Sequence, residues 1–185
     1  VMARRQRQMC IRDRYITMEM AEERIAERID ANIMNVPIKE LPDMSKSMYG
    51  KKIDKLKDKT KGRVFIKEYP TAAAHVGHFR HLLQELELKK DFKPDVIYID
   101  YLNICGSLRI RPGAGANSYT LVKSIAEELR GLAVEYDVPI MSATQTTRSG
   151  FGSTDVGLED TSESFGLPAT ADFMFALIPS EELEE

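Results

Sequence analysis

The order of apolar and polar positions along the chain predicts strands and helices that follow one another. Short apolar runs typical of strands lie at residues 15–17, 63–69, 95–100, 138–144 and 171–178. Apolar residues at helical spacing predict helices at residues 21–34, 45–59, 78–90 and 118–136. Helices that connect successive strands are the usual crossovers of a parallel sheet. The pattern therefore predicts an α/β fold with a mostly parallel sheet flanked by helices.

Two of the predicted helices differ in how much of their surface they should bury. The helix at 21–34 carries Ile25, Ile29 and Ile33 at four-residue spacing, so one buried stripe is expected. The helix at 45–59 is rich in lysine and is expected to be mostly solvated.

Three predicted strands each deliver one polar residue at or soon after their carboxyl ends: Glu19, Asp100 and Gln145. Because parallel strands point the same way, these residues are expected on one rim of the sheet, where such folds bind ligands. Asp100 could hold Mg²⁺ against nucleotide phosphates, or merely cap the following turn. Glu19 could orient and deprotonate a water, or favour a helix start.

The amide of Gln145 can donate to a phosphate oxygen and accept from water, so it could sense the presence of a phosphate. The alternative is a polar residue that simply ends a strand. Taken together, the three strand-end residues predict a nucleotide-hydrolysing site.

Composition narrows the class of protein. The chain has 185 residues with 43% hydrophobic content, which suits one α/β domain. A net charge of −3 gives no overall basic field, so any contact with nucleic acid has to be local. Two cysteines are too few for a disulfide framework, which fits a reducing cytoplasm, and no apolar run approaches the roughly 20 residues of a membrane span.

Residues 1–14 differ from the rest of the chain, with five arginines and one aspartate and no clear periodicity. They resemble a translated sequencing-adaptor remnant, and we expect a non-native segment followed by the domain at 15–185. A basic arm or targeting peptide is the alternative.

His75, His78 and His81 form a regularly spaced run. On a helix the outer two diverge by more than a shared tetrahedral metal site prefers, so we interpret them as surface histidines. A metal site at these residues is the alternative.

Three motifs in this order and spacing resemble the DnaB-type replicative helicases, especially the T-even bacteriophage branch. YITMEM corresponds to the S-L-E-M motif of that family, VIYIDYL to I-D-Y-L, and TQTTR to S-Q-L-N-R. The resemblance covers the chain from residue 15 onward. It implies a RecA-like fold, truncated at both ends, from a hexameric enzyme that couples ATP hydrolysis to translocation on single-stranded DNA and to duplex unwinding.

The resemblance also implies roles for individual residues. Glu19 would be the hydrolytic base, Asp100 the Mg²⁺ aspartate and Gln145 the phosphate sensor, with ATP and Mg²⁺ as cofactors. Arg148 matches the last arginine of the S-Q-L-N-R motif.

The segment DTSESFGLPATAD aligns with D-L-R-E-S-G-x-I-E-Q-D-A-D of the family, which places Glu163, Ser164 and Gly166 in a loop that grips single-stranded DNA. Ser162 stands where the family has Arg, and Phe165 stands at its Gly. These departures affect individual contacts with the DNA backbone, and the position of the loop is unchanged.

Arg109 and Arg111, in a glycine-containing loop, could add cations to the same channel. The alternative is that they are solvated surface arginines. The implied partners are single-stranded DNA, five further copies of the protein in a homo-hexamer, a primase and a helicase loader.

The phosphate-binding motif G-x-x-x-x-G-K-[ST] does not occur in the 185 residues, where the single Gly-Lys pair is Gly50-Lys51. We therefore expect an internal piece of the motor that is inactive by itself. Two alternatives stay open: another RecA-like ATPase of the recombinase type, and a non-catalytic RecA-fold module that binds nucleic acid or forms rings.

Overall fold

The computed structural model describes residues 12–57, 62–111, 117–145 and 167–177. Its four strands form one parallel sheet in the order β2-β1-β3-β4. The strands are β1 (Arg12–Thr17), β2 (Arg63–Glu68), β3 (Val96–Asp100) and β4 (Ile140–Ser142). The α-helices are α2 (Glu22–Met34), α3 (Lys46–Lys57), α4 (Val76–Lys90) and α5 (Ser118–Tyr136), with short 3-10 turns η1 (Ile38–Glu40) and η2 (Leu102–Ile104). The predicted parallel α/β fold is confirmed.

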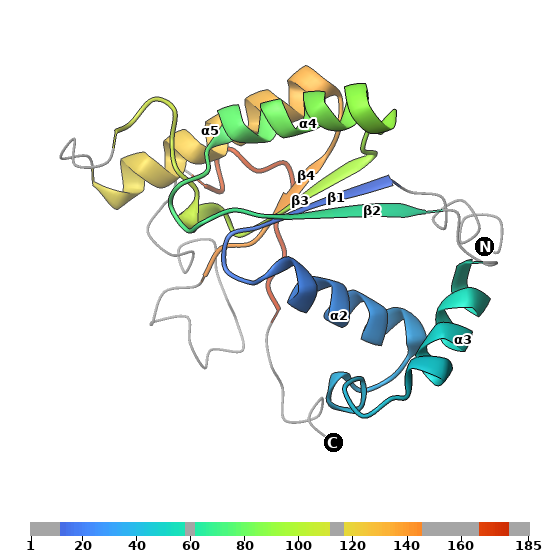
Figure 1. Cartoon of the computed structure of the whole chain (residues 1–185). Coiled ribbons are helices and arrows are strands. Elements are labelled where there is room, and N and C mark those ends of the chain that lie inside the picture. Colours follow the sequence, from blue (N-terminus) through green and yellow to red (C-terminus); the bar gives the residue numbers. More distant parts are fainter. Residues whose placement is uncertain (1–11, 58–61, 112–116, 146–166, 178–185) are drawn as a thin grey trace.

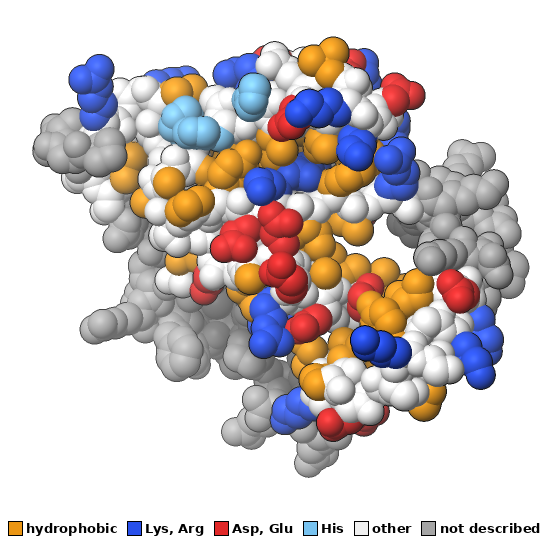
Figure 2. Space-filling view, viewed as in Figure 1, with side chains coloured by type: hydrophobic (Ala, Val, Ile, Leu, Met, Phe, Trp, Pro, Cys, Tyr) orange, Lys and Arg blue, Asp and Glu red, His pale blue; other side chains and the backbone are white. Residues whose placement is uncertain are grey.

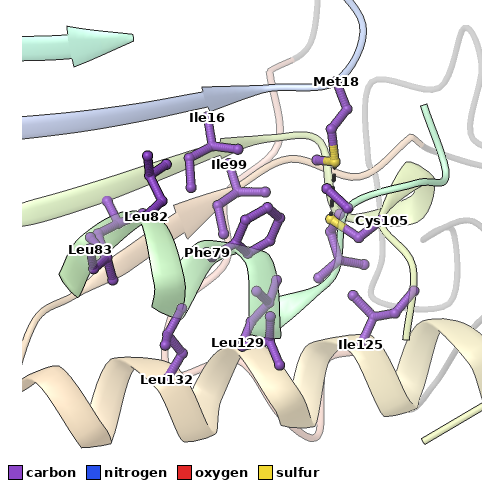
Figure 3. Packing of buried hydrophobic residues seen from close by; sticks show 14 of the residues in the cluster. Ile16, Met18, Phe79, Leu82, Leu83, Ile99, Cys105, Ile125, Leu129 and Leu132 are labelled. Carbon is purple, nitrogen blue, oxygen red and sulfur yellow. Dashed lines mark hydrogen bonds between the residues drawn. The ribbon is translucent and has the colours of Figure 1, made fainter. Parts of the chain in front are cut away.

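Helices lie on both faces of the sheet, with α4 and α5 on one face and α2 on the other (Figure 1). The main core fills the space between the sheet and the pair α4 and α5, where Ile16 and Ile99 of the strands meet Phe79 of α4 and Leu132 of α5 (Figure 3). All four side chains are at most 2% exposed. Burial of each such side chain contributes about 1.5–3 kcal/mol, so this layer dominates the stability of the fold.

The ends of the helices follow local signals in the sequence. Asn117 caps α5 by accepting a hydrogen bond from Thr120 N at 2.8 Å, and Ser45 accepts one from Met48 N at 3.3 Å at the start of α3. Asn35 and Asp137 end α2 and α5 in the left-handed conformation that terminates helices. Helix boundaries therefore lie close to those predicted.

The predicted stripe of α2 is confirmed at one end and wrong at the other. Ile25 is 4% exposed, whereas Ile33 is 48% exposed. Ile29 and Ile33 line an open hollow of about 250 Å³ between α2 and the sheet instead of a filled core. The three isoleucines have the spacing of a buried stripe, but no described residues cover its end at Ile33.

Strand β1 begins earlier than predicted. Arg12, Asp13 and Arg14 belong to it and pair in register with β2, and Asp13 and Arg14 also pair with β3. Arg12 is held by Asp95, which accepts a hydrogen bond from its backbone N at 2.8 Å and forms an ion pair with its guanidinium at 2.9 Å. The expectation that 12–14 carry no strand structure is therefore wrong, because pairing with β2, and with β3 from Asp13 onward, overrides their polar composition.

The strand predicted at 171–178 is not present over the described residues 171–177. Phe173, Phe175 and Leu177 alternate as in a strand, yet they are 80%, 66% and 89% exposed. A strand needs a hydrogen-bonded neighbour, and none of the four described strands lies in register with this segment. Within the described part of the chain, no helix is long and apolar enough to cross a membrane.

Candidate nucleotide site and arginine loop

The carboxyl ends of β1, β3 and β4 are neighbours on one rim of the sheet. Thr17 and Asp100 are register partners, and just past β1 Met18 N donates to the Asp100 carbonyl at 3.0 Å. Past β3, Leu102 N donates to the Ala143 carbonyl at 3.2 Å. Backbone hydrogen bonds therefore join the three strand ends beyond the sheet itself, which holds the segments that carry the predicted residues.

Asp100 is half-buried at the end of β3 and faces the hollow beside α2. Its Oδ2 accepts a hydrogen bond from the Tyr15 hydroxyl at 2.9 Å. Burial, together with this bond, raises the pKa of Tyr15 well above its ordinary value, so the phenol stays protonated and continues to donate. Arg28 and Asn32 of α2 line the same hollow, which gives it a polar wall around the carboxylate.

Glu19 lies two residues beyond β1, in a turn that is firmly anchored. The Thr17 hydroxyl accepts a hydrogen bond from Met20 N at 3.0 Å and donates one to the Met20 carbonyl at 2.9 Å. The Thr71 hydroxyl donates to the Met18 carbonyl at 2.7 Å. Thr17 is fully buried, whereas Glu19 is exposed, so the turn presents the carboxylate to solvent from a fixed base.

Gln145 follows β4 and contacts the end of β3. Its Nε2 donates to the Tyr101 hydroxyl at 3.3 Å, and the preceding Thr144 hydroxyl donates to Asn103 Oδ1 at 2.8 Å. Tyr101 directly follows Asp100 in the chain. A movement of the Gln145 side chain would therefore shift the Tyr101 hydroxyl, in the residue that follows Asp100. Such a link is suited to sensing a phosphate.

Three positioning residues of this rim were not predicted from the sequence: Tyr15, Thr17 and Tyr101. The sequence alone gives no signal for Tyr15, because its place on the same face as Asp100 follows from the register of β1 against β3. Four predicted residues lie outside the described residues, and these are Arg148, Glu163, Ser164 and Gly166.

Acidic side chains gather over the start of α2 on the face shown in Figure 2. Glu22, in the first turn of α2, accepts hydrogen bonds from Glu68 N at 2.9 Å and from Lys67 Nζ at 3.3 Å. The backbone hydrogen bond from Glu68 is the main cause that lowers the pKa of Glu22. This carboxylate ties α2 to the end of β2, and its role is structural.

The histidines lie on the surface over α4, as expected (Figure 2). His75 caps the helix by accepting a hydrogen bond from Gly77 N at 3.1 Å, while His78 Nδ1 accepts one from His75 N at 3.3 Å. Among the described residues, no three side chains of the metal-ligating types form a cluster. His75 and His78 therefore form the cap of α4.

A second feature near the rim is the segment at residues 106–111, here called the arginine loop, which carries Arg109 and Arg111. Glu128 of α5 holds its backbone: one carboxylate accepts from Leu108 N at 2.9 Å and from Arg109 N at 3.3 Å. The Ser107 hydroxyl also donates to Glu128 at 2.5 Å. At 8% exposure, Glu128 is a buried carboxylate surrounded by donors.

Replacement of Glu128 by Gln is expected to destabilise the fold by about 1–3 kcal/mol, because a carboxamide offers fewer acceptor sites to these donors. Burial alone would raise the pKa of Glu128, but the hydrogen bonds from Leu108, Ser107 and Arg109 together lower it. The stabilisation is therefore present above the ordinary pKa and is lost as the pH falls through the lowered value. Urea unfolding of the parent chain and of the Glu128→Gln variant at a series of acidic pH values measures the difference. The two free energies of unfolding should become equal as the pH falls.

Comparisons with known proteins bear on the family and the fold of the chain. The model of the DnaB-like helicase C-terminal domain family matches residues 2–181. The chain is 51% identical over 172 residues to the DnaB-like replicative helicase of Enterobacteria phage T4, covering 91% of this chain and 36% of that protein. It is 28% identical over 145 residues to a probable plasmid replicative DNA helicase of Chlamydia trachomatis, covering 72% of this chain and 28% of that protein.

Solved structures show the same fold. One is a DnaB-like replicative helicase, described with its interactions with primase, at a TM-score of 0.66 and 20% identity over 86% of this chain and 38% of that one. Another is described as an ATPase domain, at a TM-score of 0.67 and 19% identity over 86% of this chain and 56% of that one.

The chain spans 36% and 28% of the lengths of the two helicases above. The expected RecA-like fold is confirmed by the solved structures, and the predicted family is confirmed by the family match and by the T4 relative. The chain belongs to the DnaB-like helicase C-terminal domain family.

Proposed function

We propose that this chain supplies the hydrolytic rim of an ATP-driven replicative DNA helicase. The observation that carries the proposal is the placement of Glu19, Asp100 and Gln145 after three adjacent parallel strands in a chain of this family. Ligands of open parallel sheets bind at this edge. The substrates would be ATP and single-stranded DNA with its duplex.

Each rim residue has chemistry that suits its place. Asp100, half-buried and held by Tyr15, offers the single carboxylate that Mg²⁺ commonly takes from protein beside nucleotide phosphates. Bound Mg²⁺ would neutralise phosphate charge. Glu19, exposed on an anchored turn, would orient water and accept its proton, and Gln145 would report the phosphate to the segment after β4.

Partners follow from the family and its relatives. We propose that the whole protein acts as a homo-hexamer on single-stranded DNA, with a primase and a helicase loader as further partners. One relative of the same fold is described by its interactions with primase. Among the predicted DNA contacts, Arg109 and Arg111 are exposed on the arginine loop, and Arg148, Glu163, Ser164 and Gly166 stay predictions.

One observation favours the alternative of a non-catalytic RecA-fold module: the 185 residues contain no G-x-x-x-x-G-K-[ST] motif. Without backbone amides and a lysine to hold the phosphates, the purified chain is expected to hydrolyse ATP at the level of a buffer blank. A coupled phosphate-release assay measures this. ATP turnover at a rate typical of a helicase by the chain alone would contradict the expectation that hydrolysis needs a phosphate-binding motif from outside these 185 residues.

The proposed function is tested in a chimera, in which residues 15–185 replace the matching segment of the T4 DnaB-like replicative helicase. If the rim is functional, the chimera unwinds a forked DNA duplex in the presence of ATP and Mg²⁺. A chimera that folds and binds single-stranded DNA but does not unwind favours the non-catalytic module.

A further inference from the structure

Arg109, the predicted DNA contact, is already engaged within the chain. Its Nη1 lies 2.6 Å from Glu127 Oε2 on α5, and both side chains are about half-exposed, at 58% and 40%. We infer that Glu127 is a built-in competitor that a nucleic-acid phosphate must displace from Arg109. The inference rests on the proposed function, because it concerns the binding of single-stranded DNA.

The backbone of the arginine loop does not allow Arg109 to escape by moving as a whole. Glu128 holds Leu108 N and Arg109 N, while Ser107 Oγ accepts from Arg109 N and Ile110 N, both at 3.1 Å. On the other side, Gly106 N donates to the Ala74 carbonyl at 2.7 Å. Anchored between α5 and the start of α4, the loop leaves the Arg109 side chain as its movable part.

Consecutive glutamates on α5 thus divide two tasks. Glu128 faces inward and fixes the loop, and Glu127 faces outward and holds the guanidinium. A phosphate and a carboxylate compete for the same fork of N–H donors, so Arg109 cannot serve both fully. Because the pair is exposed, its hold is weak, and DNA can displace Glu127 at a modest loss of affinity.

Arg111 provides an internal comparison. Two residues further along, it is exposed and makes no ion pair with any described residue. A contact between Arg111 and DNA therefore carries no such competition. If Glu127 acts through Arg109, removing the Glu127 carboxylate should raise the affinity for DNA only while Arg109 is present. The presence or absence of Arg111 should not change this effect.

The test is fluorescence anisotropy of a labelled oligothymidine single strand with the full 185-residue chain. Glu127→Gln is expected to bind about two- to fivefold more tightly at low salt, and the gain should shrink as salt rises. Glu85→Gln is the matched control, because Glu85 lies away from the loop and forms an exposed ion pair of its own. The distance between Glu85 Oε1 and Lys89 Nζ is 2.6 Å. The control removes the same charge and should leave affinity nearly unchanged.

The double variant Arg109→Ala with Glu127→Gln should show no gain over Arg109→Ala, whereas Arg111→Ala with Glu127→Gln should keep it. Equal affinities of Glu127→Gln and Glu85→Gln would overturn the inference while leaving DNA binding intact. If no variant binds the strand, both the inference and the DNA-binding part of the proposed function fail.

Discussion

Replacing Arg14 with leucine is expected to stabilise the chain by roughly 2–4 kcal/mol, a gain of roughly 5–15 °C in melting temperature. Arg14 is 2% exposed on β1, where its register partners are Phe65 and Ile97. Its Nε and Nη2 are buried without a hydrogen-bond partner. Leucine removes these two unpartnered N–H groups and places an apolar side chain on the same face as the core residue Ile16.

The pH dependence of this gain follows from the pKa of Arg14, which burial lowers to about 10. A base with a lowered pKa destabilises the fold at every pH below that value, so the gain should be constant between about pH 6 and about pH 8. Thermal and urea unfolding measure it. Arg12→Leu is the matched control: it loses the ion pair with Asp95 and should be neutral or slightly destabilising.

An Arg14→Leu variant no more stable than the parent chain would mean that the guanidinium is satisfied after all. A measured gain would support the proposal that residues 1–14 are foreign to this domain, although 12–14 pair as strand and the family match begins at residue 2. The buried Asp13 Oδ1, also without a partner, points the same way. A sequence native to the centre of a parallel sheet is expected to be apolar here.

Glu19→Gln is expected to lower ATP turnover of the chimera by about 10²–10⁴-fold. Glutamine keeps the size of the side chain but cannot accept a proton from water. Because Glu19 lies on a turn held by Thr17 and is exposed, the substitution should leave folding intact. Steady-state phosphate release measures turnover, and binding of a fluorescent ATP analogue should be nearly unchanged.

Glu23→Gln serves as the control, since Glu23 is a nearby exposed carboxylate in the first turn of α2. Its turnover should stay within about twofold of the chimera, the scale of a surface charge at a helix start. Equal losses of ATP turnover in both variants would show that the overall negative charge of this face matters. Glu19 would then have no specific role in hydrolysis.

Local pattern was sufficient to predict most of the fold. Apolar runs and helical spacing located four strands and four helices of the described chain, and strand ends pointed to Asp100 and Gln145. These features depend on a few consecutive residues. The hydrogen bond from Tyr15 to Asp100 joins residues 85 apart, and it follows only from the register of β1 against β3.

The errors arise where neighbours in space decide the outcome. Ile33 has the spacing of a core residue, and Phe173 and Phe175 alternate as in a strand, yet nothing described covers or pairs with them. Arg12 and Arg14 look unlike strand residues, yet Arg12 pairs with β2, and Arg14 pairs with both β2 and β3. Sequence pattern gives the preference of a segment, whereas its surroundings decide whether that preference is met.

The most direct test of the central claim is ATP hydrolysis by the chimera, measured with and without single-stranded DNA. If residues 15–185 carry a working hydrolytic rim, the chimera hydrolyses ATP in a Mg²⁺-dependent way and DNA stimulates the rate. A chimera that folds, assembles and binds nucleotide but hydrolyses no more ATP than its Glu19→Gln variant would contradict the account.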